Sequence, residues 1–263
     1  MNLNLKNKTA VISGGGSGIG LSTAKLLVKE NVNVILLDKN IKKIDKGEFK
    51  NSKLVTVKKV DITHPSELSK IHKDLINNKQ KVNIIINCAG ITGPQGNFKD
   101  ISLDKWKNTL DINLLGPVNL TKEFLSDLNG KNWGRVIFLA SEDALQPYEE
   151  EIPYCSSKAG ILALSKGLSR TLGKKGILVN SVSPAFIKSP MTDRMMINRS
   201  KSLNISFNEA ISSFLKENRP FMTSDRRGKV SEVANVIVFL CSDKASFVNG
   251  ANYKVDAGSV ATI

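Results

Sequence analysis

Short apolar segments rich in β-branched residues alternate along this chain with longer segments of helical periodicity. The helical segments comprise residues 18–30, 65–77, 103–128, 153–173 and 230–242. Strand, helix and strand in regular succession form parallel βαβ units with right-handed crossovers. We therefore expect an α/β fold with a doubly wound, parallel, seven-stranded sheet and helices on both faces. The expected strands are Thr9–Ser13, Val32–Leu37, Leu54–Val60, Val82–Asn87, Arg135–Ala140, Ile177–Val182 and Asn252–Val255.

One connection interrupts this alternation. Residues 187–228 mix Met, Phe, Arg, Lys and Ser and have no strand pattern. A connection of that length is usually a lid or a binding segment. Because no internal repeat is visible, we expect residues 1–263 to form a single dinucleotide-binding and catalytic domain, with 187–228 as its substrate lid.

The composition narrows the class of protein. The 38 Lys and Arg residues exceed the 24 Asp and Glu residues, but they are scattered, so nucleic-acid binding is not expected. The cysteines have no CxxC pair, which indicates neither a disulfide framework nor a metal site and fits a reducing cytoplasm. No apolar run is long enough to span a membrane, and residues 1–13 do not resemble a secretory signal. The cysteines are Cys88, Cys155 and Cys241.

A glycine-rich turn joins the first expected strand to the first helix, over residues 13–20. Glycines there permit a tight turn and the close approach of a pyrophosphate, whose charge the helix N-terminus favours. A glycine cluster alone is a weak signal, and a flexible turn is the alternative. With a strand before it and a helix after it, the turn predicts a Rossmann-like cofactor site. The residues expected to bind the cofactor there are Gly14, Ser17, Gly18 and Ile19.

Asp38 ends the second expected strand, eighteen residues after Gly20. An acidic side chain at this point accepts hydrogen bonds from the adenosine ribose hydroxyls and repels a 2′-phosphate. Lys39 is a candidate partner for such a phosphate, but the glycine turn contains neither Arg nor Lys. The sequence therefore favours NAD, and NADP is the alternative.

The third and fourth expected strands also end in polar or small residues. Ligands of parallel α/β sheets bind beyond the carboxyl ends of the strands, so these residues are candidates to contact the cofactor. Each of them is also compatible with ordinary turn chemistry. The candidates are Asp61, Ile62, Asn87, Ala89 and Gly90.

Tyr154 and Lys158 lie four residues apart at the start of a helical segment, which places both on one face. The ordinary tyrosine pKa of about 10 is too high for efficient proton transfer at neutral pH. A neighbouring ammonium favours the phenolate, which allows the tyrosine to act as a general acid or base. The alternative is a surface aromatic beside an extended lysine.

Two further residues accompany this pair. Ser141 ends the fifth expected strand, where its hydroxyl is able to donate to a substrate oxygen or simply to cap a turn. Asn113 lies inside a helical segment, an unfavourable position for asparagine unless its amide has a partner. We predict that both belong to the catalytic site.

These motifs together resemble the short-chain dehydrogenase/reductase family over essentially the whole chain. The resemblance rests on glycine turn 14–20, on 87–90, on 184–189, and on Asn113, Ser141, Tyr154 and Lys158 in their order and spacing. It implies that Ile187 and Ser189 also bind the cofactor. It further implies a homodimer or homotetramer that assembles through the helices 103–128 and 153–173.

The resemblance also implies a role for each catalytic residue. Tyr154 donates or accepts the proton, and Lys158 lowers the pKa of Tyr154 and binds ribose. Ser141 polarises the substrate oxygen, and Asn113 holds a water that links the lysine to a proton relay. Five residues depart from the family pattern, which bears on cofactor binding rather than on catalysis. They are Ser13, Cys88, Ala185, Ser189 and Ala257.

The sequence thus predicts an oxidoreductase that transfers a hydride between NAD and a secondary alcohol or ketone. The alternatives are an NADP-dependent ketoreductase, such as a 3-oxoacyl reductase, and, more remotely, a non-catalytic dinucleotide-binding or nucleic-acid-associated protein. In the lid, Met and Phe residues suit an apolar substrate, whereas Arg194, Arg199 and Lys201 suit a carboxylate or phosphate. A solvated amphipathic cover over the cofactor is the alternative. The acidic residues between Ser141 and Tyr154 are interpreted as a solvated loop, and recognition of a polar or cationic substrate is the alternative. His64 and His72 lie in a surface-like helical segment and receive no role.

Overall fold

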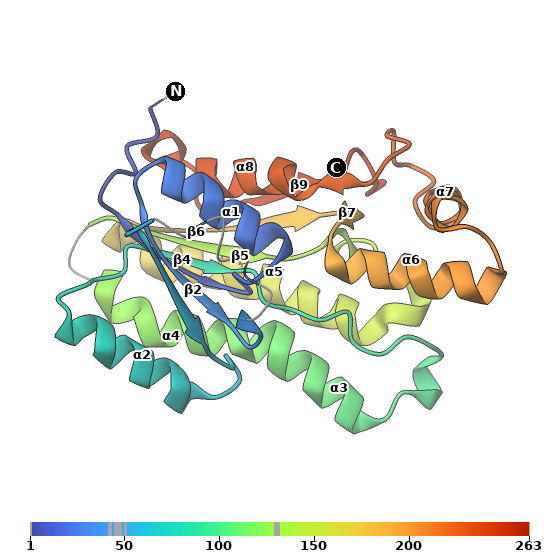
Figure 1. Ribbon diagram of the computed structural model, residues 1–263, viewed down its shortest axis with the longest axis horizontal. Helices are drawn as coiled ribbons and strands as arrows, with labels where there is room; N and C mark the ends of the chain where they lie inside the picture. Colours follow the sequence, from blue (N-terminus) through green and yellow to red (C-terminus); the bar gives the residue numbers. More distant parts are fainter. Residues whose placement is uncertain (1, 42–43, 45–48, 50–51, 129–131, 263) are drawn as a thin grey trace.

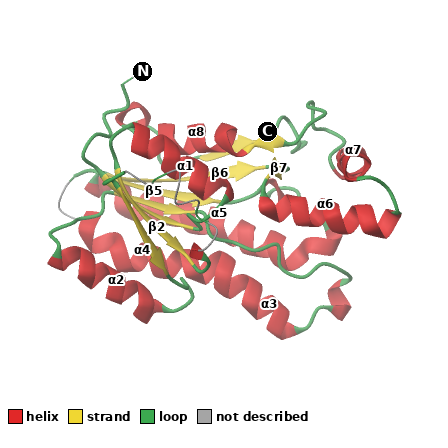
Figure 2. Ribbon diagram, in the orientation of Figure 1, coloured by secondary structure: helices red, strands yellow, loops and turns green. Residues whose placement is uncertain are grey.

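The computed structural model describes residues 2–41, 44, 49, 52–128 and 132–262, and a seven-stranded sheet forms its centre (Figures 1 and 2). The strand order is β3-β2-β1-β4-β5-β6-β9, and every neighbouring pair is parallel. The order reverses between β1 and β4, which is where doubly wound sheets bind their ligands. The expected sheet is confirmed. Its strands are β1 Thr9–Ser13, β2 Asn33–Asp38, β3 Val55–Lys59, β4 Ile84–Asn87, β5 Gly134–Leu139, β6 Ile177–Pro184 and β9 Asn252–Val255.

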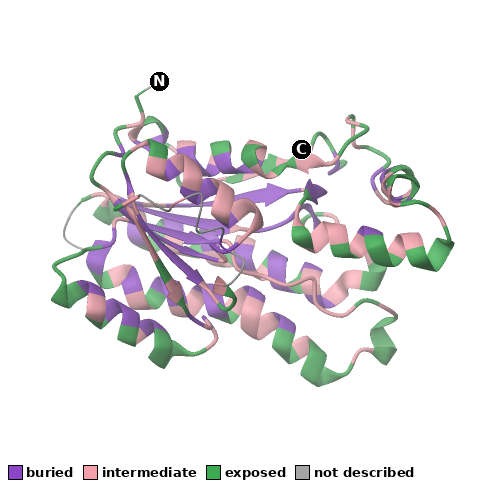
Figure 3. Cartoon of the chain, in the orientation of Figure 1, coloured by how far each residue is buried: buried purple, intermediate pink, exposed green. Residues whose placement is uncertain are grey.

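Helices cover both faces of the sheet. The helices α1 (Gly18–Lys29) and α8 (Val230–Cys241) pack on one face, and α2 (Pro65–Asn77), α4 (Gly116–Leu128) and α5 (Ile152–Leu172) pack on the other. Neighbouring residues of a strand point to opposite faces, so β1 contributes Ala10 and Ile12 to the first core and Val11 to the second. The central strands are therefore buried on both sides, as Figure 3 shows, whereas the edge strands β3 and β9 are partly exposed.

The expected helix 103–128 is not continuous. It consists of α3 (Leu103–Leu110), a π-helical turn (Asp111–Leu115) and α4. Asn113 lies in the π-helical turn and is completely buried. A single wide turn leaves the apolar periodicity nearly unchanged, and such turns occur frequently at functional sites.

The segment 187–228 does contain strands, contrary to expectation. The two-residue strands β7 (Ile187–Lys188) and β8 (Gly228–Lys229) pair in parallel and enclose α6 (Pro190–Leu203) and α7 (Phe207–Asn218). Strands this short carry no recognisable apolar alternation. Capping boxes at Ser189 and Ser206 begin the two helices, which satisfies the free N–H groups of their first turns.

His72 is not a surface residue, although the pattern of its helix suggested one. It is 6% exposed and lies between α2 and α4. Its Nδ1 is 3.0 Å from Glu123 Oε1, and its Nε2 is 3.2 Å from Asp127 Oδ1. The side chain thus joins two helices that cover the same face of the sheet.

Among the described residues, no helix is both long enough and apolar enough to cross a bilayer.

Candidate active site

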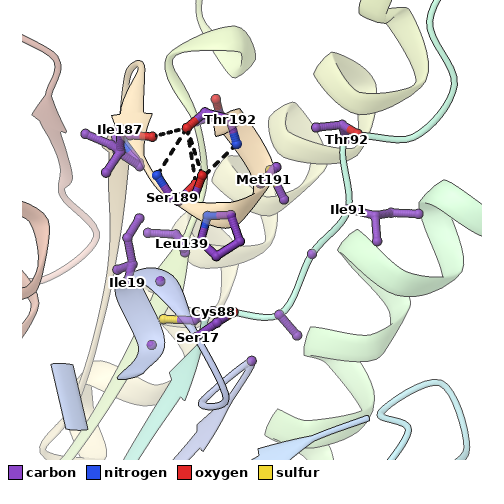
Figure 4. A pocket seen from close by; sticks show the side chains of 18 of the residues that line it. Ser17, Ile19, Cys88, Ile91, Thr92, Leu139, Ile187, Ser189, Met191 and Thr192 are labelled. Carbon is purple, nitrogen blue, oxygen red and sulfur yellow. Dashed lines mark hydrogen bonds between the residues drawn. The ribbon is translucent and has the colours of Figure 1, made fainter. Parts of the chain in front are cut away.

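A cavity of about 390 Å³ opens at the carboxyl ends of the strands and extends from Asp38 to Tyr154. Figure 4 shows Ser17 and Ile19 on one side, Ile91 on the other, and the turn from Ser189 to Thr192 above them. Most of the residues predicted from the sequence line this cavity. They are Gly14, Ser17, Gly18, Ile19, Asp38, Asp61, Ile62, Ala89, Gly90, Ser141, Tyr154, Lys158, Ile187 and Ser189.

The glycine turn is packed too closely for side chains. Gly14 has a φ of +67°, and a Cβ there would lie 2.7 Å from the backbone nitrogen of Ala89. A Cβ on Gly20 would lie 2.4 Å from the carbonyl oxygen of Gly14. Ser13, where the family usually has threonine, keeps a hydroxyl that accepts a hydrogen bond from the Ala89 N–H at 3.4 Å. This close-packed backbone beside the start of α1 fits the pyrophosphate of a dinucleotide.

Gly16 connects the turn to Asp38, because its N–H donates to Asp38 Oδ2 at 2.9 Å. A Cβ at position 16 would lie 2.7 Å from that oxygen. We therefore predict that Gly16→Ala displaces Asp38 and raises the Kd for NAD by about tenfold or more. The measurement is a fluorescence titration of the purified variant with reduced NAD.

Gly167→Ala is the matched control for this substitution. Gly167 lies in α5, and a Cβ there would meet no atom within 4 Å. Alanine favours a helix over glycine by about 1 kcal/mol, so this variant should be slightly more stable and should bind NAD normally. Equal NAD affinity in the two variants would show that Asp38 does not depend on the glycine turn.

Asp38 is oriented by backbone hydrogen bonds, since Asn40 also donates its N–H to Asp38 Oδ1 at 2.8 Å. Lys39, the candidate partner for a 2′-phosphate, is already paired, with its Nζ 2.8 Å from Asp61 Oδ2. Burial opposes ionisation of Asp61, but hydrogen bonds from Lys39 and Thr63 outweigh it and lower the pKa of Asp61 to about 2. This end of the cavity thus presents the carboxylate of Asp38 and a charged lysine that is paired with Asp61.

Tyr154 and Lys158 lie on the first turns of α5, at the far end of the cavity. Lys158 Nζ is 5.6 Å from the centre of the Tyr154 ring and donates a hydrogen bond to the carbonyl oxygen of Leu139 at 2.9 Å. Ser141 follows β5, and its Oγ accepts a hydrogen bond from the Asp143 N–H at 3.3 Å. The serine therefore caps the turn and keeps its own hydroxyl proton for another acceptor.

The pKa of Tyr154 differs from the expectation drawn from its lysine neighbour. Burial raises the pKa of Tyr154, and the charge of Asp143 raises it further, while a hydrogen bond with Ser141 acts in the opposite direction. Burial also lowers the pKa of Lys158 to about 8. Because burial raises its pKa, Tyr154 is protonated at neutral pH.

Asn113 and Asn87 lie behind the cavity wall rather than in it. The Asn113 Oδ1 accepts from the Ile91 N–H at 2.8 Å, and its Nδ2 donates to the Ile91 carbonyl at 2.9 Å and to Ser157 Oγ at 3.1 Å. The amide therefore has the partners that its position inside a helix requires. Asn87 donates from Nδ2 to Thr121 Oγ1 at 3.3 Å. Asn113 supports the loop that follows β4, and Asn87 joins the end of β4 to α4.

A buried ionic cluster beside Ser141 was not anticipated. Arg219, at the end of α7, donates from Nε to Glu142 and lies with its Nη2 3.5 Å from Asp143 Oδ1. Its guanidinium stacks 4.1 Å from the centre of the Tyr148 ring. Asp143 is 5% exposed, so the interpretation of this region as a solvated acidic loop is wrong for Asp143. The cluster joins the segment 187–228 to the turn that follows Ser141.

The mouth of the cavity is formed by α6. Met191, Arg194 and Met195 line it, whereas Arg199 does not and instead donates from Nε to Ser213 Oγ at 3.0 Å. Of the basic residues considered for a substrate anion, only Arg194 therefore lies at the cavity. Phe186 and Met196 anchor α6 in a small apolar cluster with α7.

The sequence matches the family described as short chain dehydrogenase over residues 8–199. It is 31% identical to the uncharacterised oxidoreductase YvaG of Bacillus subtilis (strain 168), with all of both chains covered. It is also 31% identical to the 3-oxoacyl-[acyl-carrier-protein] reductase FabG of Rickettsia felis, with 97% of this chain and 98% of that protein covered. The chain therefore belongs to the short-chain dehydrogenase/reductase family and is an oxidoreductase of alcohol or keto groups.

Solved structures agree with this assignment. The L-sorbose reductase of Gluconobacter frateurii, complexed with NADPH and L-sorbose, superimposes with a TM-score of 0.92 over the whole of both chains at 26% identity. A levodione reductase superimposes with a TM-score of 0.88 over 99% of this chain and 100% of that chain, at 25% identity. These proteins share the sheet and the surrounding helices.

Proposed function

We propose that this oxidoreductase uses NAD to interconvert a secondary alcohol and a ketone. The observation that carries the proposal is a single cavity with Asp38 at one end and Ser141, Tyr154 and Lys158 at the other. Asp38 suits an unphosphorylated adenosine ribose, and Lys39, which would suit a phosphate, is paired with Asp61. NAD, when bound, supplies the hydride acceptor or donor at its nicotinamide carbon C4.

The side chains of the protein then perform the remaining steps. Ser141 donates a hydrogen bond to the substrate oxygen and stabilises the charge that develops there. Tyr154 gives a proton to that oxygen during reduction and takes it during oxidation. Lys158, held by the Leu139 carbonyl, would donate to the nicotinamide ribose of bound NAD, and its charge would support the phenolate that forms. Asn113 acts as a positioning residue for the loop after β4 and for the water of the proton relay.

The pH dependence of kcat/KM should differ between oxidation of the alcohol and reduction of the ketone. Oxidation needs Tyr154 without its proton, and the pKa of Tyr154 is raised, so kcat/KM for oxidation should rise about tenfold per pH unit through the neutral range. Reduction needs the phenol and a charged Lys158, whose pKa is about 8, so it should be nearly flat at neutral pH and decrease above pH 8. Initial rates measured in both directions test this, and an oxidation rate independent of pH would contradict it.

The second candidate function is an NADP-dependent ketoreductase. Relatives named as 3-oxoacyl reductases and the NADPH complex of L-sorbose reductase support this alternative. It would require Lys39 to leave Asp61 and to offset the charge of Asp38. The comparison of the two cofactors described in the Discussion separates the candidates.

A panel of secondary alcohols and hydroxy acids, incubated with NAD and the purified protein, tests the proposed function. The expected result is formation of reduced NAD, followed by its absorbance, with at least one member of the panel. No reduction of NAD or NADP by any member, combined with a salt-sensitive complex with DNA or RNA, would instead favour the non-catalytic alternative.

We also propose a cellular location and an oligomeric state for the enzyme. The three cysteines form no disulfide, which fits a reducing cytoplasm. A homodimer or homotetramer, built through α3, α4 and α5 as family resemblance suggests, would cover Leu115, which is 49% exposed in the π-helical turn before α4. Light scattering on the purified protein should give two or four times the 28.7 kDa mass of the chain.

A further inference from the structure

Arg219 is a charged side chain that the fold buries against the turn Glu142–Ala144, which follows Ser141. It is 7% exposed, and its partners Glu142 and Asp143 are 1% and 5% exposed. Buried carboxylates destabilise a fold unless a cation and hydrogen bonds compensate their charge. Among the described residues, Arg219 is the only cation that forms an ion pair with either of them. The end of α7 thus supplies the positive charge that this turn needs.

Every nitrogen atom of the Arg219 guanidinium has a partner within the protein. Nε donates to Glu142, Nη1 donates to the Asn218 carbonyl at 2.8 Å, and Nη2 lies 3.5 Å from Asp143 Oδ1. The guanidinium also stacks on Tyr148, 4.1 Å from the centre of the ring. Arg219 lines the cavity, but these contacts favour a role in holding the turn over direct binding of a substrate anion.

The position of the Ser141 hydroxyl depends on this turn. Ser141 Oγ accepts a hydrogen bond from the Asp143 N–H at 3.3 Å. The backbone hydrogen bonds within the turn are short-range, such as the one from the Leu145 N–H to the Glu142 carbonyl at 2.8 Å. Bonds of this kind fix the shape of the turn, whereas its place in the cavity wall depends on longer-range contacts such as that of Arg219.

We infer that Arg219 is a positioning residue, which anchors the turn Glu142–Ala144 to α7 and thereby holds the Ser141 hydroxyl where it faces the substrate oxygen. The inference rests on the proposed function, in which Ser141 donates to that oxygen. The adjacent nitrogens Nε and Nη2 face two carboxyl groups at once, which the single ammonium of a lysine reproduces only in part. A displacement of the serine by about 1 Å would reduce catalysis on the order of 100-fold.

The test introduces Arg219→Met into the wild-type protein and into Ser141→Ala. The rate of a single turnover is measured at saturating NAD and alcohol and at high enzyme concentration, so that slow variants remain measurable. In the wild-type background, Arg219→Met should reduce this rate about 10- to 100-fold and leave the Kd for NAD nearly unchanged. In Ser141→Ala, it should reduce the rate by less than about threefold, because the hydroxyl that it positions is already absent. Arg219→Lys should give an intermediate rate.

Arg226→Met is the matched control, because Arg226 pairs with Glu232 but is 54% exposed and lies outside the residues that line the cavity. It should leave the rate unchanged in both backgrounds. If Arg219→Met does not fold, Arg219→Met combined with Glu142→Met replaces the ion pair by apolar side chains of similar length, with the same expected rates. An equal loss in both backgrounds, or no loss in the wild type, would overturn the inference. Wild-type turnover by Ser141→Ala would instead contradict the proposed function.

Discussion

Tyr154→Phe should reduce kcat by about 10²- to 10⁴-fold, because the phenol oxygen is the proposed proton donor and acceptor. The benzene ring that remains fills the same volume in the first turn of α5, so the cavity keeps its shape. The Kd for NAD, measured by fluorescence titration, should therefore change by no more than a small factor. Steady-state kinetics with the best alcohol of the panel provide the measurement.

The matched control is Tyr253→Phe, which removes a phenol oxygen from β9, outside the residues that line the cavity. It should leave both kcat and the Kd for NAD unchanged. Retained turnover in Tyr154→Phe would show that Tyr154 does not transfer the proton. A parallel loss of NAD binding would show that the ring supports the cofactor rather than the chemistry.

Asp38→Ser should change the cofactor preference on the order of 100-fold, measured as the ratio of kcat/KM for NADP to that for NAD. The wild-type carboxylate accepts backbone hydrogen bonds from Gly16 and Asn40 and would repel a 2′-phosphate. Serine keeps a hydrogen-bonding group for the ribose but removes the negative charge. A ratio that does not change would show that Asp38 lies away from the adenosine ribose.

Lys39→Ala tests whether the enzyme uses NAD, as proposed, or NADP, as in the alternative. In the proposed enzyme, Lys39 pairs with Asp61, so its removal should change the NADP to NAD ratio only slightly. If the lysine instead binds a 2′-phosphate, the variant should lose most of its NADP activity while its NAD activity persists. That outcome would favour the ketoreductase.

The seven strands were predictable because a parallel sheet covered on both faces buries most residues of its central strands. Continuous apolar runs such as Ile84–Asn87 therefore stand out against the helical segments. The strands β7 and β8 were not predictable, since two residues hold no alternation. The π-helical turn at Asn113 also left no periodic trace, although the misplaced asparagine was a signal.

The cavity was predictable as far as it depends on local motifs. The ends of parallel strands meet at one edge of the sheet, so Asp38, Asp61 and Ser141 converge there without knowledge of side-chain contacts. The partnership of Arg219 with Glu142 was not predictable, because it joins residues 77 positions apart. Arginine followed by proline indicates only the end of a helix. The burial of Asp143 follows from that long-range contact.

The most direct test of the proposed function follows the transferred hydride with a deuterium label. The alcohol with the highest rate is prepared with deuterium on its carbinol carbon and oxidised by the purified protein with NAD. We predict that the deuterium appears at C4 of the reduced nicotinamide, and that Tyr154→Phe forms this labelled product about 10²- to 10⁴-fold more slowly. Oxidation that releases the deuterium to water, or labelled product formed equally fast by the variant, would contradict it.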